Sequence, residues 1–273
     1  MNAFVTVKRC LSLYACIILM PLVLGGCATV GGVLGSVNLV SSDEEVKMGQ
    51  DLSVEVSKQD EIYNNAEVTA YVQAVGARVV KHCDRQDIAY HFSVIKKDEI
   101  NAFALPGGYI YVYTGLMKDI DDESELAAVL SHEVGHVTAR HAAKRLSVMY
   151  TAQAIQNAVL GESPGFFAKI LAEATTTGGF LAYSRQDEYE ADQLGQKYLY
   201  AAGYDPNGMI DLMGKLKSVE SGEPSKLESM LATHPPTNER LSRIQAMVAA
   251  EPRLANPVRN QAAYAKIKAL LPK

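Results

Sequence analysis

The chain has 273 residues, of which 48% are hydrophobic and 21% are charged, and its formal net charge is −5. This length is enough for one sizeable hydrophobic core. A mildly acidic chain in which no basic patch stands out is not expected to bind nucleic acid, so we predict no nucleic-acid partner.

Residues 1–26 have the pattern of a secretory signal peptide. Two basic residues precede an apolar run from Leu11 to Leu24, which is interrupted and shorter than the roughly 20 apolar residues that a membrane-spanning helix needs. The run ends in Leu-Gly-Gly-Cys, residues 24–27, which resembles the lipobox of bacterial lipoproteins. That resemblance implies cleavage before Cys27, lipidation of Cys27 and, because Ala28 follows, an anchor in the outer membrane that faces the periplasm. The alternative is an ordinary signal peptide followed by an incidental cysteine.

The segment 27–42 is rich in Gly, Val and Ser and is predicted to be a lipidated N-terminus with a flexible tether. Two of the four cysteines lie in the signal peptide, so lipidation of Cys27 leaves Cys83 alone and the mature chain without an internal disulfide. We predict one main domain over residues 43–250 and a helical C-terminal tail over residues 251–273.

Helical spacing begins directly after the tether. Ser42 is the expected N-cap of a first helix, because Glu45 follows three residues later, as in a capping box. A second helix is predicted over residues 67–82, where four valines at helical spacing form one stripe: Val68, Val72, Val75 and Val79.

Three short β-rich runs, YHFSVIKK, INAFALP and YIYVYTG, predict a small antiparallel sheet. The fold class is therefore α+β, mainly helical, with the sheet beside the helix that comes next. The alternating Tyr109, Tyr111 and Tyr113 allow two interpretations: they line one face of a strand, or they mark an exposed edge on which an extended substrate is laid. We take Asn101, Gly108 and Tyr109 as candidate substrate-binding residues.

The second half of the chain is predicted to be mainly helical. One helix runs from Asp122 to about Tyr150. Residues 151–182 contain Gly-rich and Thr-rich breaks, so we predict a mobile, lid-like region there. A further helix over residues 186–202 is closed by Gly203, a residue favoured at a helix C-terminus. Two more helices are predicted near residues 207–220 and 237–250.

The helix from Asp122 contains the sequence HEVGH at residues 132–136. Because an α-helix turns by about 100° per residue, His132 and His136 lie about 40° apart on the helical wheel and one turn apart along the axis. Both imidazoles can therefore bind one metal ion, and Glu133 lies beside this face as a general base for metal-activated water. The pattern predicts one zinc ion per chain. The alternative is a helix with two histidines at its surface or at the edge of the core.

A catalytic zinc ion needs a third protein ligand and an open position. The candidates are Glu188 and Asp192 in SRQDEYEADQLG, because they lie four residues apart on one helical face. One carboxylate can bind the metal while the other, one turn away, orients a ligand histidine. The alternative is a charged, solvated helix surface. His141 would lie on the side of the helix opposite His132, so we interpret it as a neighbour of the site or a surface residue.

These motifs together resemble those of a known family. HEVGH, EYEAD at residues 188–192 and THPPTNERL at residues 233–241 are similar to the motifs of the gluzincin metalloproteases of the HtpX and CAAX-prenyl-protease superfamily, especially their soluble, periplasmic, BepA- and LoiP-like branch. The segment 101–117 resembles the one that precedes the zinc helix in that family. We expect this chain to lack the transmembrane helices of HtpX-type members and the helical-repeat domain of BepA.

The resemblance implies a zincin-like fold and a role for each motif. It implies zinc ligation by His132, His136 and Glu188, water activation by Glu133, and support of these groups by Asp192 and Arg240. His234 lies on a loop made rigid by two prolines and has two candidate uses, as a fourth zinc ligand at rest or as a donor to the transition-state oxyanion. The resemblance favours the first use; a loop histidine that only caps backbone is the remaining alternative.

The sequence thus predicts a zinc-dependent endopeptidase, lipid-anchored in the bacterial cell envelope and facing the periplasm. Metal-activated water would attack a peptide carbonyl with Glu133 as general base. The resemblance implies unfolded or misassembled envelope proteins as substrates, and the lipid on Cys27 makes the membrane a partner. The alternative is a zinc-stabilised periplasmic chaperone or assembly factor with little proteolytic activity, in which His234 closes a structural site.

Overall fold

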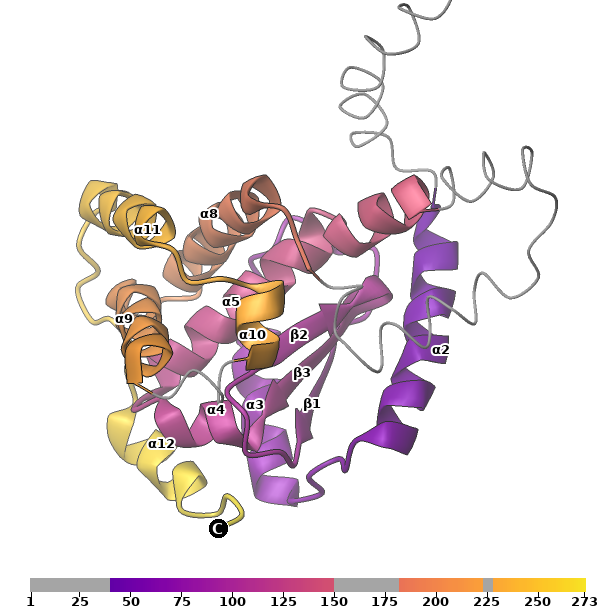
Figure 1. Ribbon diagram of the computed structural model, residues 1–273. Helices are drawn as coiled ribbons and strands as arrows, with labels where there is room; N and C mark the ends of the chain where they lie inside the picture. Colours follow the sequence, from indigo (N-terminus) through magenta and orange to yellow (C-terminus); the bar gives the residue numbers. More distant parts are fainter. Residues whose placement is uncertain (1–39, 150–181, 223–227) are drawn as a thin grey trace, which may run out of the picture.

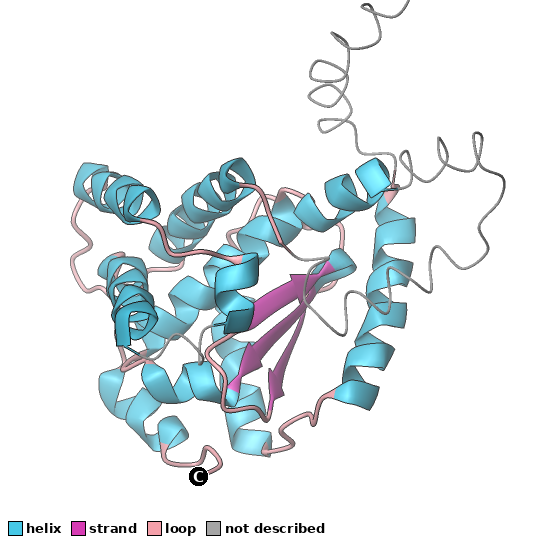
Figure 2. Cartoon of the chain, viewed as in Figure 1, coloured by secondary structure: helices cyan, strands magenta, loops and turns pink. Residues whose placement is uncertain are grey.

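The computed structural model describes residues 40–149, 182–222 and 228–273. The predicted signal peptide, the lipidation site at Cys27 and the lid-like segment up to residue 181 lie outside these ranges. Helices surround a small sheet and make up most of the described chain (Figure 1, Figure 2). Within the described ranges, none of the helices is long and apolar enough to cross a membrane.

The sheet has three strands in the order β1-β3-β2, with β1 at His91–Ile95, β2 at Ala102–Leu105 and β3 at Tyr109–Tyr113. β2 and β3 pair antiparallel, as predicted, but β1 and β3 are parallel, so the expectation of a wholly antiparallel sheet is wrong. The reason is the short 3₁₀ turn η1 (Pro106–Gly108), which folds β3 back between β1 and β2. The sheet is therefore mixed.

β3 is the central strand, and its side chains alternate between two layers. Ile110 and Val112 belong to the larger core, which includes α3 (Ala66–Val80) and α5 (Glu123–Thr138). Tyr111 and Tyr113 belong to a smaller core against α2 (Ser42–Gln59). Because β3 is paired on both sides, the interpretation of its tyrosines as an exposed edge is wrong.

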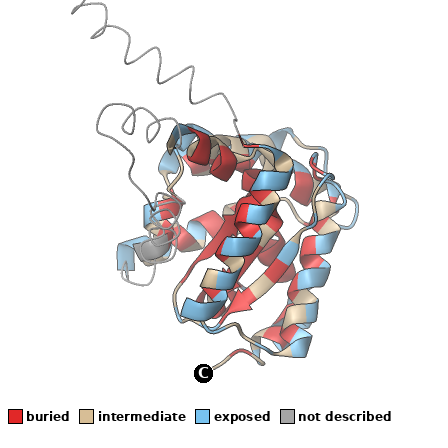
Figure 3. Cartoon of the chain, turned by 90° about the vertical axis from the view of Figure 1, so that its right-hand side faces the viewer, coloured by how far each residue is buried: buried red, intermediate tan, exposed pale blue. Residues whose placement is uncertain are grey.

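The sheet is thus a middle layer between α2 on one face and α3 with α5 on the other (Figure 1). Seen from the side of α2, the helices carry exposed residues next to buried ones along their length (Figure 3). The buried residues of α2 recur at helical spacing, which is the pattern of a helix that covers a core with one face: Glu45, Met48, Gly49, Leu52 and Val56.

The larger core is organised around α5. Every residue from Glu123 to Val137 is buried, as expected for a helix enclosed on all sides. The remaining named elements are α4 Thr114–Asp119, α8 Arg185–Ala201, α9 Asn207–Gly222, α10 Glu228–Thr233, α11 Asn238–Ala250 and α12 Gln261–Lys268. The predictions near residues 67–82, 186–202, 207–220 and 237–250 correspond to α3, α8, α9 and α11, whereas α4 and α10 were not predicted.

Two predicted helix boundaries need correction. The N-cap of α2 is Ser41, with Glu44 completing the capping box, one residue earlier than expected, and the buried Glu45 instead binds Arg85. The predicted continuous helix from Asp122 to residue 150 is interrupted: α5 ends at Thr138, and residues 141–149 form a separate helical segment. The break lies at Arg140, whose φ of 57° is incompatible with a continuing α-helix.

Residues 251–273 pack onto the larger core. Tyr264 and Ile267 of α12 are buried there, and the Tyr264 hydroxyl donates a hydrogen bond of 2.6 Å to the carbonyl of Met117. Arg259 pairs with three carboxylates from other parts of the chain: Asp122, Asp205 and Asp211. Within residues 251–273, helix α12 covers only Gln261–Lys268, and it packs against the larger core.

Candidate metal centre

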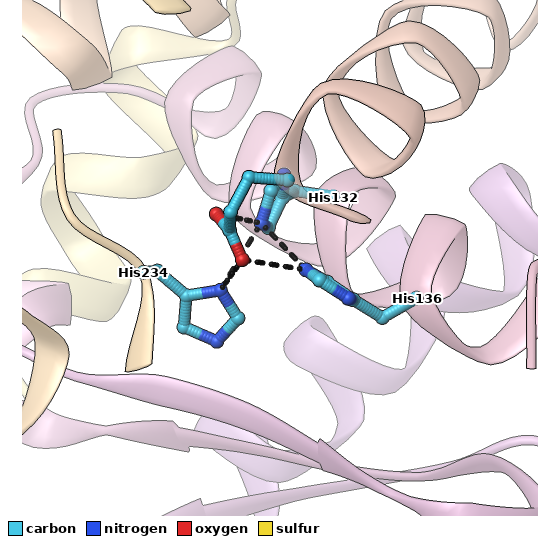
Figure 4. Close-up of side chains that lie close together, drawn as sticks. His132, His136 and His234 are labelled. Carbon is cyan, nitrogen blue, oxygen red and sulfur yellow. Dashed lines mark hydrogen bonds and ion pairs between the residues drawn. The ribbon is translucent and has the colours of Figure 1, made fainter. Parts of the chain in front are cut away.

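Four buried side chains converge in the larger core. They are His132 and His136 of α5, Glu188 of α8 and His234, which directly follows α10, and one ligand atom of each lies within 4.8 Å of the others. His132 Nε2 is 3.1 Å from His136 Nε2 and 3.4 Å from His234 Nδ1. Figure 4 shows the three imidazoles turned toward a common point. The structure therefore brings together residues that lie far apart in the sequence.

The convergence depends on close packing of α5 and α8. A Cβ atom on Gly135 would lie 2.7 Å from the carbonyl oxygen of Ala191, and one on Gly195 would lie 3.0 Å from the backbone of His132. Only glycine permits this approach at both positions. As a result Glu188 Oε1 reaches to 3.3 Å from His136 Nε2.

Glu188 and Asp192 take different positions, which shows which carboxylate is the candidate metal ligand and which one orients a histidine. Glu188 faces the cluster, whereas Asp192 lies behind it, with Oδ1 3.0 Å from His132 Nδ1. Arg240 of α11 links the two carboxylates. Its guanidinium donates hydrogen bonds of 2.7 and 2.8 Å to Asp192 and lies 2.7 Å from Glu188 Oε2. Asp192 and Arg240 thus fix the orientation of two residues of the cluster.

The charges of the cluster favour a bound cation. Burial opposes ionisation of Asp192, but Arg240 outweighs it and lowers the pKa of Asp192 to about 2. Burial likewise opposes ionisation of Glu188, yet His234 and the other imidazoles hold its pKa well below the ordinary value. Burial alone would lower the pKa of His132, but Asp192 and Glu188 raise it to about 10. Positive charge is therefore stabilised at the point where the side chains meet.

This donor set fits zinc. Imidazole nitrogens and a carboxylate oxygen are ordinary zinc ligands, and here they are buried, convergent and oriented by Asp192 and Arg240. Glu133 lies beside the cluster, with Oε1 3.8 Å from His234 Nε2. Within the described residues, the buried Glu133 Oε2 and His234 Nε2 have no hydrogen-bond partner. The cluster is consistent with a single zinc site flanked by a carboxylate that is free to accept a proton.

A small pocket of about 20 Å³ adjoins the cluster. Its polar wall includes His132, Glu133 and His234. Its other wall is apolar and rich in methionine, with residues of α5, α9 and α10: Ala128, Val129, Met209, Leu212, Met213, Leu216 and Met230. None of the three candidate substrate-binding residues of the strand region lines this pocket.

Those three residues have partners elsewhere. The carbonyl of Asn101 accepts a hydrogen bond from the backbone of Tyr113, and Gly108, with φ 94°, packs closely against Ala89. The ring of Tyr109 stacks on His91 with 4.6 Å between centroids. Their assignment to substrate binding stays a prediction.

His141 was predicted to be a neighbour of the site or a surface residue, on the side of the helix opposite His132. The break at Arg140 places its Nδ1 2.9 Å from His136 Nδ1, so it is a neighbour of the site, although the predicted side of the helix is wrong. A second neighbour, Tyr183, escaped the sequence analysis. The ring of Tyr183 stacks on His136 with 4.1 Å between centroids, and burial raises the pKa of its hydroxyl well above the ordinary value. Tyr183 lies just before α8, where helical periodicity carries no signal.

Comparisons with known proteins agree with this geometry. A family model described as Peptidase family M48 matches residues 66–248. The chain is 31% identical over 212 residues to the Beta-barrel assembly-enhancing protease of Escherichia coli (strain K12), covering 74% of this chain and 43% of that protein. It is 31% identical over 211 residues to the Mitochondrial metalloendopeptidase OMA1 of Schizosaccharomyces pombe, covering 76% of this chain and 62% of the relative. The chain spans less than two thirds of the length of these relatives.

Proposed function

Since the chain belongs to peptidase family M48 and is a metalloendopeptidase with a candidate zinc site, we propose that it hydrolyses peptide bonds in misfolded or stalled proteins of the bacterial envelope. The observation that carries this proposal is the buried cluster of His132, His136 and Glu188 with Glu133 beside it. A structural site needs no free carboxylate at this position, whereas hydrolysis requires a proton acceptor there.

The residues of the chain divide the chemistry between them. When bound, zinc supplies a Lewis acid that polarises the peptide carbonyl and activates water at neutral pH. Glu133 accepts the proton of the attacking water and then delivers it to the nitrogen of the leaving amine. Its burial excludes bulk water, so the transferred proton stays within the site.

His234 acts as a cap in the conformation described here. Its Nδ1 lies 2.9 Å from Glu188 Oε1 and 3.4 Å from His132 Nε2, which is the place of a fourth donor. A zinc ion with four protein ligands is closed, whereas a catalytic one keeps a position open. We therefore regard this conformation as a resting state from which His234 moves aside when substrate binds.

The methionine-rich pocket supports unfolded proteins as substrates. It adjoins Glu133, and at about 20 Å³ it has room for little more than a water molecule in this conformation. A substrate side chain next to the scissile bond would enter it once the methionine side chains shift. Apolar side chains of that kind are exposed mainly in unfolded or misassembled proteins. Methionines adapt their shape to different apolar groups, which suits a protease that meets many sequences.

The envelope location rests on the sequence and on one relative. A signal peptide followed by a lipidated Cys27 would anchor the enzyme in the outer membrane with its site in the periplasm. The name of one relative, a beta-barrel assembly-enhancing protease, supports β-barrel proteins as one group of substrates. Mass spectrometry of membrane-extracted protein tests the anchor, because a mature chain that begins elsewhere or carries no lipid on Cys27 would exclude it.

One observation favours a second function, a zinc-stabilised chaperone or assembly factor. His234 completes a set of four donors, and four protein ligands are usual for structural zinc sites. In that case the protein would hold unfolded chains without cleaving them. The two functions differ in whether Glu133 is needed.

The test compares the wild type with Glu133→Gln, which keeps the size of the side chain and removes the base. We expect the wild type to cleave casein and an unfolded outer-membrane protein, and the variant to be slower by at least about a hundredfold while it retains one zinc ion. Zinc content is measured by elemental analysis. If the wild type and Glu133→Gln suppress aggregation equally well and neither of them cleaves either substrate, the result would support the chaperone instead.

A further inference from the structure

We propose that His141 is the positioning residue of the zinc ligand His136. Its Nδ1 lies 2.9 Å from His136 Nδ1, and the two rings meet at 71° with centroids 4.9 Å apart. Both side chains are buried. The inference rests on the zinc site of the proposed function, and it concerns how strongly and in which orientation that site holds its metal.

The direction of this hydrogen bond follows from the cluster. His136 turns its Nε2 inward, 3.1 Å from His132 Nε2 and 3.3 Å from Glu188 Oε1. A neutral histidine that offers Nε2 to a metal carries its proton on Nδ1, so His136 is the donor and His141 Nδ1 is the acceptor. The proton of His141 is then on Nε2, which faces Glu190 and Asp187 at 3.3 and 3.4 Å.

The two histidine ligands of α5 therefore have partners of different kinds. His132 donates from Nδ1 to the buried carboxylate of Asp192, which Arg240 holds in place. His136 donates to a neutral imidazole, and the carboxylates beyond that imidazole are partly exposed to solvent. An outer hydrogen bond fixes the tautomer and the ring orientation of a metal-bound histidine. His141 thus accepts the hydrogen bond that fixes the tautomer and ring orientation of His136, as Asp192 does for His132.

A break in the helix places His141 beside His136. In an uninterrupted helix it would lie about 140° around the axis from His136, out of reach. The break at Arg140 removes this separation, with a positive φ that long side chains rarely adopt. Arg140 is held in that conformation by hydrogen bonds of 2.7 Å to the carboxylate of Glu45 and to the carbonyl of Val40. An unusual backbone conformation held from several sides is typical of functional sites.

The test uses three single variants of the full chain. His141→Leu removes the acceptor, and His141→Asn restores an acceptor, because its side-chain oxygen comes close to the place of Nδ1. Leu146→Ala is the matched control, since Leu146 is a buried residue of the same helical segment and belongs to the smaller core. Zinc affinity is measured by competition with a chelator, and the absorption spectrum is recorded for the cobalt-substituted proteins.

We expect His141→Leu to weaken zinc binding by about 10–100-fold and to change the cobalt spectrum. We expect His141→Asn to recover most of the affinity, and Leu146→Ala to lower the unfolding midpoint without changing affinity or spectrum. Wild-type affinity and spectrum in His141→Leu would overturn the proposal. Equal weakening in all three variants would overturn it as well, because general destabilisation would then explain the loss. Metal binding is measured without hydrolysis, so a wild type that binds zinc but cleaves nothing contradicts the proposed function alone.

Discussion

At the scale of single residues, His234 presents its two ring nitrogens to two different groups. Nδ1 meets Glu188 at 2.9 Å, whereas Nε2 faces Glu133 at 3.8 Å. As a fourth donor, His234 would exclude water from a zinc ion bound at the cluster. As a mobile side chain, it would instead donate a hydrogen bond to the oxyanion of the transition state. The two roles predict opposite effects of its removal.

We expect His234→Ala to raise the rate of casein cleavage, because the structure places the imidazole among the candidate metal ligands. Steady-state rates are compared at equal zinc content, and a double variant with Glu133→Gln measures any contaminating protease. If His234 is instead an essential oxyanion donor, the substitution should lower the rate, since the loss of such a donor costs about 2.7–4 kcal/mol of transition-state stabilisation. A rate lower by about a hundredfold or more would therefore exclude the cap.

The sequence could reveal residues of the site only where the helices are continuous. Spacing brought out His132 with His136 and Glu188 with Asp192, because α5 and α8 are regular over those residues. The same spacing misplaced His141, since the positive φ of Arg140 resets the helical phase just before it. Such a break depends on contacts with residues about a hundred positions earlier, which periodicity does not contain.

At the scale of elements, the distance between α5 and α8 sets the geometry of the metal centre. Gly135 and Gly195 let the two backbones approach until α8 delivers Glu188 to the histidines of α5. The spacing of the carboxylates predicted which face of α8 carries the ligand, but it gave no measure of this distance. The role of the glycines became visible only with the packing of the two helices.

We expect Gly135→Ala to destabilise the fold by about 1–3 kcal/mol and to weaken zinc binding, because the added methyl group would overlap Ala191 and push α8 away. Gly214→Ala in α9 is the matched control. Nothing lies within 4 Å of the added methyl group there, so this change should be neutral or stabilise by up to about 1 kcal/mol. Urea unfolding and zinc content are measured for both. Similar effects of the two changes would contradict the packing argument.

The strands illustrate a second limit of prediction at this scale. The three β-rich runs were found where the structure has strands, since strand-favouring residues bounded by turn residues are a local signal. Their order and direction depend on how η1 returns the chain between β1 and β2, which is a property of the whole sheet. The six-residue helices α4 and α10 were missed because fewer than two turns show no clear periodicity.

At the scale of the whole molecule, Arg259 joins the C-terminal part of the chain to the larger core. Its guanidinium contacts Asp205 at 2.6 Å, Asp211 at 2.8 Å and Asp122 at 2.9 Å. Asp122 is the N-cap of α5, so the same contact also supports the start of the zinc helix. Burial opposes ionisation of Asp205, but hydrogen bonds from Arg259 and Asn207 outweigh it and hold the pKa of Asp205 below its ordinary value.

We expect Arg259→Ala to lower the free energy of unfolding by about 1–2 kcal/mol at neutral pH, a modest value because the guanidinium is partly exposed. A carboxyl group with a lowered folded-state pKa stabilises the fold above its unfolded-state pKa of about 3.9 and loses this contribution as the pH falls through the folded-state value. The cost of the substitution should therefore shrink below about pH 4. Urea titrations of the wild type and the variant, at neutral pH and below about pH 4, measure this cost.

The control for this prediction is Lys96→Ala, which removes an exposed pair with Glu61. That change should alter the free energy of unfolding by no more than about 0.5 kcal/mol at either pH. A cost of Arg259→Ala that is the same at neutral and acidic pH would show that Asp205 does not contribute through its charge.

His132 and His234 are 102 positions apart in the chain, and this separation also bears on how the protein is synthesised. A chain is synthesised from its N-terminus, so HEVGH leaves the ribosome well before Glu188, His234 and Arg240. Contacts across long loops form only after those loops have closed, which makes the centre one of the last parts of the molecule to assemble. A chain synthesised only as far as HEVGH therefore still lacks Glu188 and His234, and the candidate metal centre is incomplete until the last part of the chain has been made.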